Sequence, residues 1–378
     1  MRQKTLIALA IVTAPILLAA IVVPSEHGTA SKPADTGPVF PTLKDWIGGA
    51  TKLTVTGATG SVTLTRTPPA QAPAAGTPPV EGWGLAEKGG YPVQDNLIRP
   101  LIGGLVALHT VEPKTERPKL YDRIDIEDPS ASKEAKSKLI ELDDANGASI
   151  VKLILGRRRN DPVGGGSDSI YVRKPDEARA WTAQPAFDAP TDALGWIDHK
   201  IIDLDPDKIK TVTLTPAGGK PLLLEREKAG DKLTVRDLPK DAPLKSDTPG
   251  SDIVNGFRYL DLLDVKPAAQ VTGAATATAE IVTFDGLDVT VSLFDQPGGP
   301  FAEVAAKGEG DAAKEVDDIA KRTNGWAYRI AEQRAKLFES KMADLLTPPP
   351  PPPAPAGAVP PTPILPPAAP KPVVKPSK

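Results

Sequence analysis

The side chains that most often carry out catalysis are scarce in this chain. Among its 378 residues there is no cysteine, and the three histidines are His27, His109 and His199. Without cysteine the chain has no disulfide, no thiolate metal site and no thiol nucleophile. A metal site or a Ser-His-Asp triad would need His109 or His199, and neither has neighbours whose types and spacing complete such a set. We therefore expect no metal, no cofactor and no catalytic residue, and hence no enzyme.

Two patterns match ligand-binding loops only in part. Gly164 to Gly166 precede Ser167, but the Gly-Lys-Ser/Thr ending of a phosphate-binding loop is missing, and the next segment predicts a strand. Asp203, Asp205 and Asp207 alternate as in a calcium loop, without the glycine at the sixth position and the distal glutamate. The first pattern predicts a loose hairpin, and the second predicts the lead into the next strand.

The charge of the chain does not indicate a polyanionic partner. The formal net charge is −3, and aromatic residues make up 4% of the sequence. Proteins that bind nucleic acid typically have a basic stripe or a set of stacking aromatics. Arg157 to Arg159 could bind phosphate or an acidic partner, although three arginines at a strand end are more typical of a solvated turn. We expect no nucleic-acid partner.

An apolar segment near the N-terminus predicts a membrane anchor. Arg2 and Lys4 precede Thr5 to Val23, which is uncharged and, at about 1.5 Å per residue, long enough to cover most of a hydrocarbon core of about 30 Å. The next basic residue is Lys32, so the positive-inside rule places the N-terminus in the cytoplasm and the rest of the chain outside. A cleaved signal peptide is the alternative, with small residues before a cut after Ala30. Either outcome exports the body of the protein.

Proline-rich segments flank the body. Residues 24–41 form a spacer after the anchor at 1–23, and residues 347–378 hold 15 prolines among 32 residues. Such a composition forms no core and favours polyproline II, at about 3.1 Å per residue. The tail is either a disordered extension, or an arm through the cell wall, or a strand that docks in an aromatic groove. A third stretch, residues 68–79, predicts a swollen hairpin loop.

The remaining residues contain one pattern twice. Lys52 to Thr56 and Ser61 to Arg66 alternate apolar and polar side chains around a turn, which predicts a β-hairpin. About 159 positions later, Lys210 to Thr215 and Pro221 to Arg226 repeat this order, down to the arginine that closes the second strand. The sequence therefore predicts two units, at residues 42–190 and 191–346.

Each unit predicts the order β-β-β-α-β-β-β. The helices are expected at Gln94 to Leu108 and at Asp252 to Leu263, where leucine, isoleucine and phenylalanine recur every three or four residues. The fold class is therefore α+β, with two tandem repeats of antiparallel sheet, each with one packed helix, after the N-terminal membrane helix. A longer amphipathic helix is expected at about Gly325 to Leu346, either as part of the core or as a partner-binding or membrane-surface helix.

Several short motifs resemble the DUF4340 domain. After the anchor come GWGL at residues 82–85, GYPVQ at 90–94, KLILG at 152–156 and YVR at 171–173. The resemblance covers roughly residues 42–346. We call the side chains that carry it the family-motif residues: Trp83, Tyr91, Pro92, Tyr171 and Arg173. We expect them to pack and to pair strands; a binding surface is the alternative reading.

The resemblance implies a bacterial envelope protein whose role is not established. Members are often encoded beside components similar to a gliding-associated ABC transport system, and no catalytic residue comes with the family. We therefore expect a protein of the bacterial inner membrane with its body in the periplasm, acting as a noncatalytic adaptor or accessory subunit of an ABC-type transport system. The alternative is an exported module that binds lipid or cell-wall polymer in a groove between the sheets.

Overall fold

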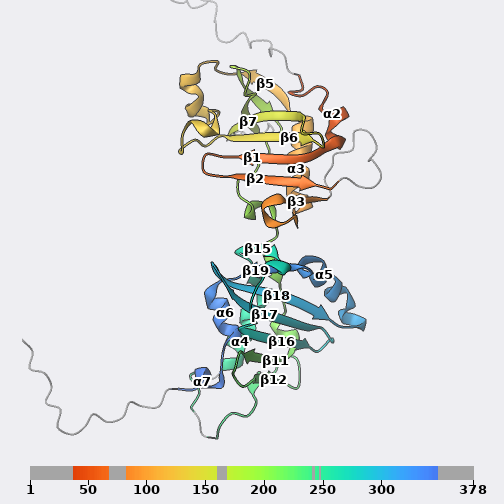
Figure 1. Cartoon of the computed structure of the whole chain (residues 1–378), viewed down its shortest axis with the longest axis vertical. Coiled ribbons are helices and arrows are strands. Elements are labelled where there is room, and N and C mark those ends of the chain that lie inside the picture. The colour runs from red at the N-terminus through yellow and green to blue at the C-terminus, as the bar shows by residue number, and fades with distance from the viewer. Residues whose placement is uncertain (1–36, 68–81, 160–167, 241–242, 247, 348–378) are drawn as a thin grey trace, which may run out of the picture.

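Two large antiparallel sheets carry the fold (Figure 1). The structure, a computed structural model, describes residues 37–67, 82–159, 168–240, 243–246 and 248–347. The expected anchor at 5–23, most of the spacer, the loop at 68–79, the glycines at 164–166 and the tail from Pro348 lie outside these residues. Across the described ranges, no helix combines the length and the apolar character needed to cross a membrane.

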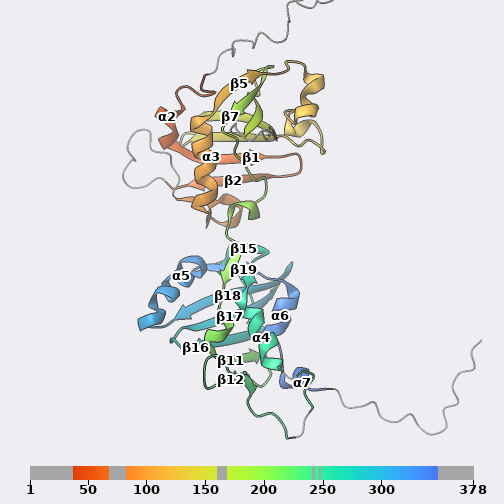
Figure 2. The ribbon, with the colours of Figure 1, turned by 180° about the vertical axis from the view of Figure 1, so that it is seen from behind.

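The first sheet has nine strands in the order β4-β3-β2-β1-β6-β7-β8-β9-β5. Leu53 pairs with Leu64 on one side and with Leu142 on the other, so buried leucines line up across one face. Helix α3 (Asp95–Ala107) covers this face, as Figure 2 shows. The strands are β1 (Ala50–Thr56), β2 (Ser61–Arg66), β3 (Trp83–Leu85), β4 (Tyr91–Pro92), β5 (His109–Pro113), β6 (Lys138–Asp144), β7 (Ser149–Arg159), β8 (Ser169–Arg173) and β9 (Ala180–Gln184).

The second sheet has eight strands in the order β13-β12-β11-β16-β17-β18-β19-β15. Helix α4 (Pro249–Arg258) crosses one face and packs against α6 (Glu332–Phe338), where the rings of Phe257 and Phe338 meet edge to face at 4.9 Å. The strands are β11 (Ile209–Pro216), β12 (Leu222–Glu225), β13 (Thr234–Val235), β15 (Asp264–Pro267), β16 (Ala277–Thr283), β17 (Asp288–Gln296), β18 (Gly299–Lys307) and β19 (Trp326–Arg329).

Shorter elements complete the described chain. Strand β10 (Lys200–Ile202) pairs with β14 (Leu260–Asp261) in a separate two-stranded sheet. The remaining helices are α2 (Leu43–Trp46), α5 (Ala313–Thr323) and α7 (Met342–Leu345).

The two sheets share one connectivity. Along the first sheet the run β3-β2-β1-β6-β7-β8-β9-β5 corresponds, strand by strand, to β13-β12-β11-β16-β17-β18-β19-β15 in the second. In both sheets, the arginine at the end of the second strand also donates hydrogen bonds to backbone carbonyls at the start of the first. Arg66 donates to the carbonyls of Gly48 and Ala50 at the start of β1, and Arg226 donates to the carbonyl of Ile209 at the start of β11.

The structure adds three strands, β4, β5 and β9, to the first sheet of the predicted order and two, β15 and β19, to the second. Strand β5 follows α3 directly, and β15 follows α4 after the short strand β14. Both form the far edge of their sheets, where they pair with the final strands β9 and β19. These short segments lack a strong alternation, and their partners are more than 50 residues away, so the local pattern does not reveal them. The mixed, antiparallel architecture agrees with the prediction.

The long helix predicted at Gly325 to Leu346 is wrong. Gly325 takes a left-handed conformation with φ at +82°, and the next residues form β19 between β18 and β15. Only the short helices α6 and α7 follow. Trp326, Tyr328 and Ile330 alternate in a way that favours a strand, and the long-range pairing of β19 overrides the apolar spacing of four that predicted a helix.

The edges of the two sheets meet at one junction, built around Tyr91. The Tyr91 ring lies edge-on to Trp326 at 4.9 Å and to Tyr328 at 6.2 Å between centroids. Lys88 forms an ion pair of 2.6 Å with Asp264 beside these rings. Tyr91 is 7% exposed, so its side chain is a buried link between the first and second sheets.

We predict that Tyr91→Ala destabilises the protein by about 3 kcal/mol, because truncating a buried aromatic leaves a cavity at the junction. Urea unfolding followed by tryptophan fluorescence measures the change. Tyr259→Ala is the matched control, since Tyr259 is 50% exposed and its loss should stay within about 0.5 kcal/mol. Equal stability of the two variants would contradict the importance of the junction.

Candidate functional site

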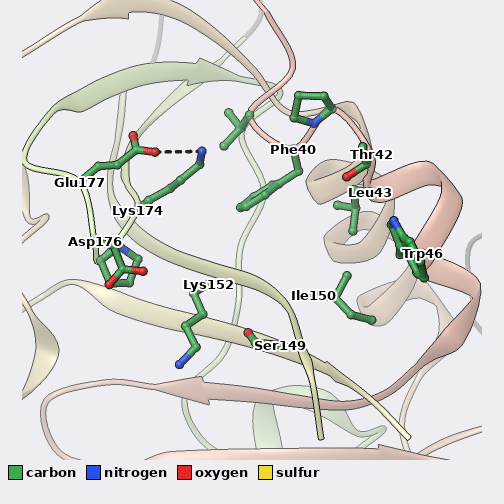
Figure 3. Close-up of a pocket in the computed structure, with 13 residues that line it drawn as sticks. Phe40, Thr42, Leu43, Trp46, Ser149, Ile150, Lys152, Lys174, Asp176 and Glu177 are labelled. Carbon is green, nitrogen blue, oxygen red and sulfur yellow. Dashed lines mark hydrogen bonds and ion pairs between the residues drawn. The ribbon is translucent and has the colours of Figure 1, made fainter. Parts of the chain in front are cut away.

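An open cleft lies at one end of the first sheet (Figure 3). Its volume is about 480 Å³, and its walls come from residues 39–46, 149–152 and 174–177. These are the segment that carries α2, the beginning of β7, and the turn between β8 and β9. Three segments that are distant in sequence therefore meet around one depression on the surface.

One wall of the cleft is apolar and aromatic. Leu43 is buried beneath α2, and this anchors the single helical turn to the sheet. The Val39 amide donates to the carbonyl of Leu108 at 2.8 Å, which ties the preceding residues to the end of α3. With the segment fixed in this way, Phe40 borders the cleft and Trp46 remains 65% exposed at its rim. An exposed tryptophan held on an anchored element is typical of a binding surface.

The opposite wall is charged. Lys174 forms an ion pair of 3.1 Å with Glu177, and its ammonium lies 5.7 Å from the centroid of the Phe40 ring. Lys152 forms an ion pair of 3.0 Å with Glu141, and the hydrogen bond with this carboxylate raises the pKa of Lys152 above its usual value. Carboxylates thus hold both lysines at the wall of the cleft, where they can contact a bound ligand.

Arg173 lies beneath the charged wall and holds its backbone in place. Its guanidinium is buried and donates to the carbonyls of Lys174, Pro175 and Glu177 at 3.3, 3.1 and 3.3 Å. Its Nε atom donates to the carbonyl of Ile126 at 3.1 Å. These bonds to successive carbonyls fix the turn that contributes Lys174 and Glu177 to the cleft, so Arg173 acts as a positioning residue for the wall.

A smaller cleft of about 160 Å³ adjoins the first. The two share Val39, Lys174 and Glu177, and the smaller one is also bordered by Trp181. Together they form an open groove with apolar and charged sides. Such a groove can hold an extended chain with ring or alkyl contacts on one side and a charge on the other.

The family-motif residues lie apart from the cleft or beneath it. Trp83 is buried in the first sheet and Tyr91 lies in the junction, while Pro92 is exposed on β4. Tyr171 packs against the small cluster that contains Tyr121 and Ile154. Arg173 supports the cleft through the backbone, as described above.

Each histidine within the described residues contacts a backbone carbonyl. His109 and His199 contact the backbone carbonyls of Ala107 and Leu194. Within the described residues, no group of three or more His, Cys, Asp or Glu side chains could hold a metal ion.

The three arginines at the end of β7 are paired with acidic side chains. Arg157, Arg158 and Arg159 contact Asp125, Asp168 and Glu112 at 3.2, 3.4 and 3.8 Å, respectively. Because these partners balance the charge of the arginines, the segment is not an open anion site.

The aspartates at 203, 205 and 207 also interact with neighbouring residues in the sequence. Asp203 pairs with Lys200 at 2.9 Å. Asp205 accepts a hydrogen bond from the amide of Asp207 at 3.0 Å and caps the turn that leads into β11. This matches the interpretation of these residues as the lead into a strand.

Sequence reasoning missed Phe40 and Trp46. Phe40 lies at the end of the predicted spacer, and Trp46 lies between the spacer and the first predicted strand, in a segment with no strong periodicity. The available signal was the occurrence of two large aromatics in a chain that has few, directly after a proline-rich stretch. Their partners across the cleft are more than 100 residues further along, which only the folded chain reveals.

One family model matches the chain. Its description is "Domain of unknown function (DUF4340)", and it matches residues 83–278, which is more than half of the chain. The match runs from β3 of the first sheet into β16 of the second, so it includes the junction residue Tyr91. No curated protein matches the chain.

We predict that Arg173→Met destabilises the protein by roughly 2 to 4 kcal/mol, because several backbone carbonyls lose a charged donor. The same change should accelerate hydrogen exchange of the Glu177 amide, which closes the turn by donating to the Lys174 carbonyl. Arg179→Met is the control, because Arg179 is partly exposed and pairs with Glu116 at the surface. Unchanged exchange at Glu177 would contradict the positioning role of Arg173.

Proposed function

This chain belongs to the DUF4340 family, and we propose that it acts as a membrane-anchored, noncatalytic adaptor or accessory subunit of an ABC-type envelope transport system. Its body would lie in the periplasm of a bacterial cell, with the segment at 5–23 as the anchor in the inner membrane. The charge distribution around that segment supports this orientation.

The contacts that the family-motif residues make are the main support for this proposal. Tyr91 joins the two sheets, Trp83 packs inside the first, and Arg173 donates to backbone carbonyls. None of these three side chains is directed at a candidate reacting group, since each is committed to packing or to the backbone. Motif residues that stabilise the fold, and do not surround a reacting group, suit a protein that binds partners better than one that catalyses a reaction.

We further propose that the body consists of two copies of one unit, at residues 42–190 and 191–346. The shared strand order and the matching roles of Arg66 and Arg226 support a duplication. Joined at the Tyr91 junction, two such units form an extended pair of sheets. This geometry suits an adaptor that spans the distance between a membrane component and a second partner.

The alternative, an exported module that binds lipid or cell-wall polymer, is less well supported. A lipid chain needs an enclosed apolar cavity, and the two clefts at the end of the first sheet are open and have charged walls. The exposed Trp46 is compatible with a polymer ligand, but the predicted anchor at residues 5–23 supports a role within a membrane assembly.

Crosslinking in cells followed by purification in detergent tests the adaptor role. We expect a permease or an ATPase of an ABC-type system to copurify with the full chain. A matched control carries a cleavable signal peptide in place of residues 1–23, which exports the body without an anchor and should recover much less of the transporter. Recovery of no transporter component with the full chain would contradict the proposal.

A further inference from the structure

The described chain begins at the edge of the first sheet that lies opposite the junction. Strand β5 closes that edge, while β4, which carries Tyr91, closes the other. The Thr110 amide donates to the Gly37 carbonyl at 3.0 Å, and Pro38 forms a β-bridge with His109, so the first described residues lie along β5. Helix α2 and the larger cleft follow directly, on the side of the first sheet that faces away from the second (Figure 1).

A short stretch of sequence separates this edge from the proposed membrane anchor. Thirteen residues, 24–36, lie between the apolar segment at 5–23 and Gly37. At about 3.5 Å per extended residue, they span at most about 45 Å. An anchor at 5–23 therefore keeps the edge at β5 close to the bilayer, while the second sheet lies beyond all nine strands of the first.

Helix α2 holds an indole at this end of the body. Leu43 and Ile47 are buried in the core, and Trp46 between them in sequence is 65% exposed. Figure 3 shows the indole at the rim of the cleft, beside the helical turn. Because the flanking side chains are packed into the core, Trp46 is fixed at the surface nearest to the anchor.

Further apolar side chains surround this indole. Phe40 and Ile150 line the same cleft and are partly exposed, and Pro41 is exposed. We call Phe40, Pro41, Trp46 and Ile150 the Trp46 face. Two basic and two acidic side chains also line the cleft: Lys152, Lys174, Asp176 and Glu177. These charges balance, so the apolar and aromatic contact, and not a net charge, decides what the face binds.

The interface between a membrane and water matches the chemistry of the Trp46 face. Tryptophan is enriched at this interface, because its ring is apolar and its N–H group finds hydrogen-bond partners at the level of the headgroups. Lysine side chains are also accommodated there, since their charged ends reach the hydrated headgroup layer. A separate protein partner would have to be recruited, whereas the proposed anchor holds the bilayer beside the face at high effective concentration.

We propose that the Trp46 face rests on the lipid bilayer, with the indole of Trp46 at the level of the headgroups. The body then stands upright, with the first sheet against the membrane and the second extending away from it. The Thr347 amide donates to the Pro243 carbonyl in the loop after β13, the edge strand farthest from the junction, so the proline-rich tail starts at the distal end. This inference rests on the anchor at 5–23, which is part of the proposed function, and does not depend on the transport role.

Fluorescence quenching by brominated lipid tests the contact. The full chain is reconstituted into phosphatidylcholine vesicles with or without bromine near the ester end of the acyl chains, where bromine quenches only indoles in its immediate vicinity. The segment at 5–23 contains no tryptophan, so the anchor adds no signal. We expect bromine to reduce the emission of the wild-type chain, and we expect Trp46→Phe to lose most of this quenching. Trp181→Phe is the matched control, because it removes a partly exposed indole and should keep the quenching.

Two results of this experiment would overturn the proposal. Equal quenching of the wild-type and Trp46→Phe chains would show that another indole is the one near the lipid. An unquenched wild-type chain would show that the face does not touch the bilayer and would leave a protein or a glycan as its partner.

A relocated indole tests the upright orientation. Tyr259→Trp, added to the Trp46→Phe chain, places an indole at an exposed position beyond the junction, since Tyr259 is 50% exposed. We expect bromine not to quench this indole. Quenching as strong as that of the wild-type chain would mean that the second unit also lies on the membrane, and would overturn the orientation.

Flotation separates the failure of this inference from the failure of the proposed function. A chain that floats with the vesicles after an alkaline carbonate wash has a membrane anchor. If such a chain shows no quenching at Trp46, the anchor is correct and the inference is wrong. A chain that does not float has no anchor, and the inference then fails together with that part of the proposed function.

Discussion

The edge-to-face packing of Tyr91 against Trp326 and Tyr328 is the interaction on which the arrangement of the two sheets depends. Burial disfavours the phenolate and raises the pKa of both tyrosines above the ordinary value, so the rings remain neutral over the physiological range. Around them, the ion pair between Lys88 and Asp264 adds a directional contact at the rim of the junction. Three aromatic rings and one ion pair thus link two sheets whose buried residues belong to one continuous cluster.

A second constraint is that each sheet buries its main core on one face; on the other face of the first sheet, Ile154 and Tyr171 pack with Tyr121 in a smaller cluster. In the first sheet Leu53 and Leu64 face the helix side, while Thr54 pairs with Thr63 on the other side, where both are partly exposed. In the second sheet Thr213 and Glu280 occupy the corresponding open face. Polar, partly exposed strands of this kind keep the open face soluble, and Trp46 beside the groove is the most exposed of the large hydrophobic side chains among the described residues.

The sequence predicts the parts of this fold that are encoded locally. The alternation at Lys52 to Thr56 and the apolar spacing before Leu108 correspond to β1 and α3, because each pattern lies within one element. The edge strands β5 and β15 and the strand β19 could not be predicted from the sequence, because they are stabilised by pairing with strands that are distant in sequence. Tyr91 was recognised as part of a motif, but its contact with Trp326, 235 residues away, follows only from how the sheets meet. The groove could not be predicted for the same reason, since Phe40 and Glu177 border it from segments that are distant in sequence.

The central claim is that the junction makes the two sheets one rigid body that works by contact. Because the chain has no native cysteine, one cysteine can be placed in each sheet, at Thr54 and Thr213, without competing labels. The distance between spin labels at these positions, measured by pulsed electron paramagnetic resonance, tests the claim most directly. A single narrow distance distribution is the result that a rigid junction predicts. A broad distribution in the otherwise unaltered chain would contradict it, because the sheets would then move independently.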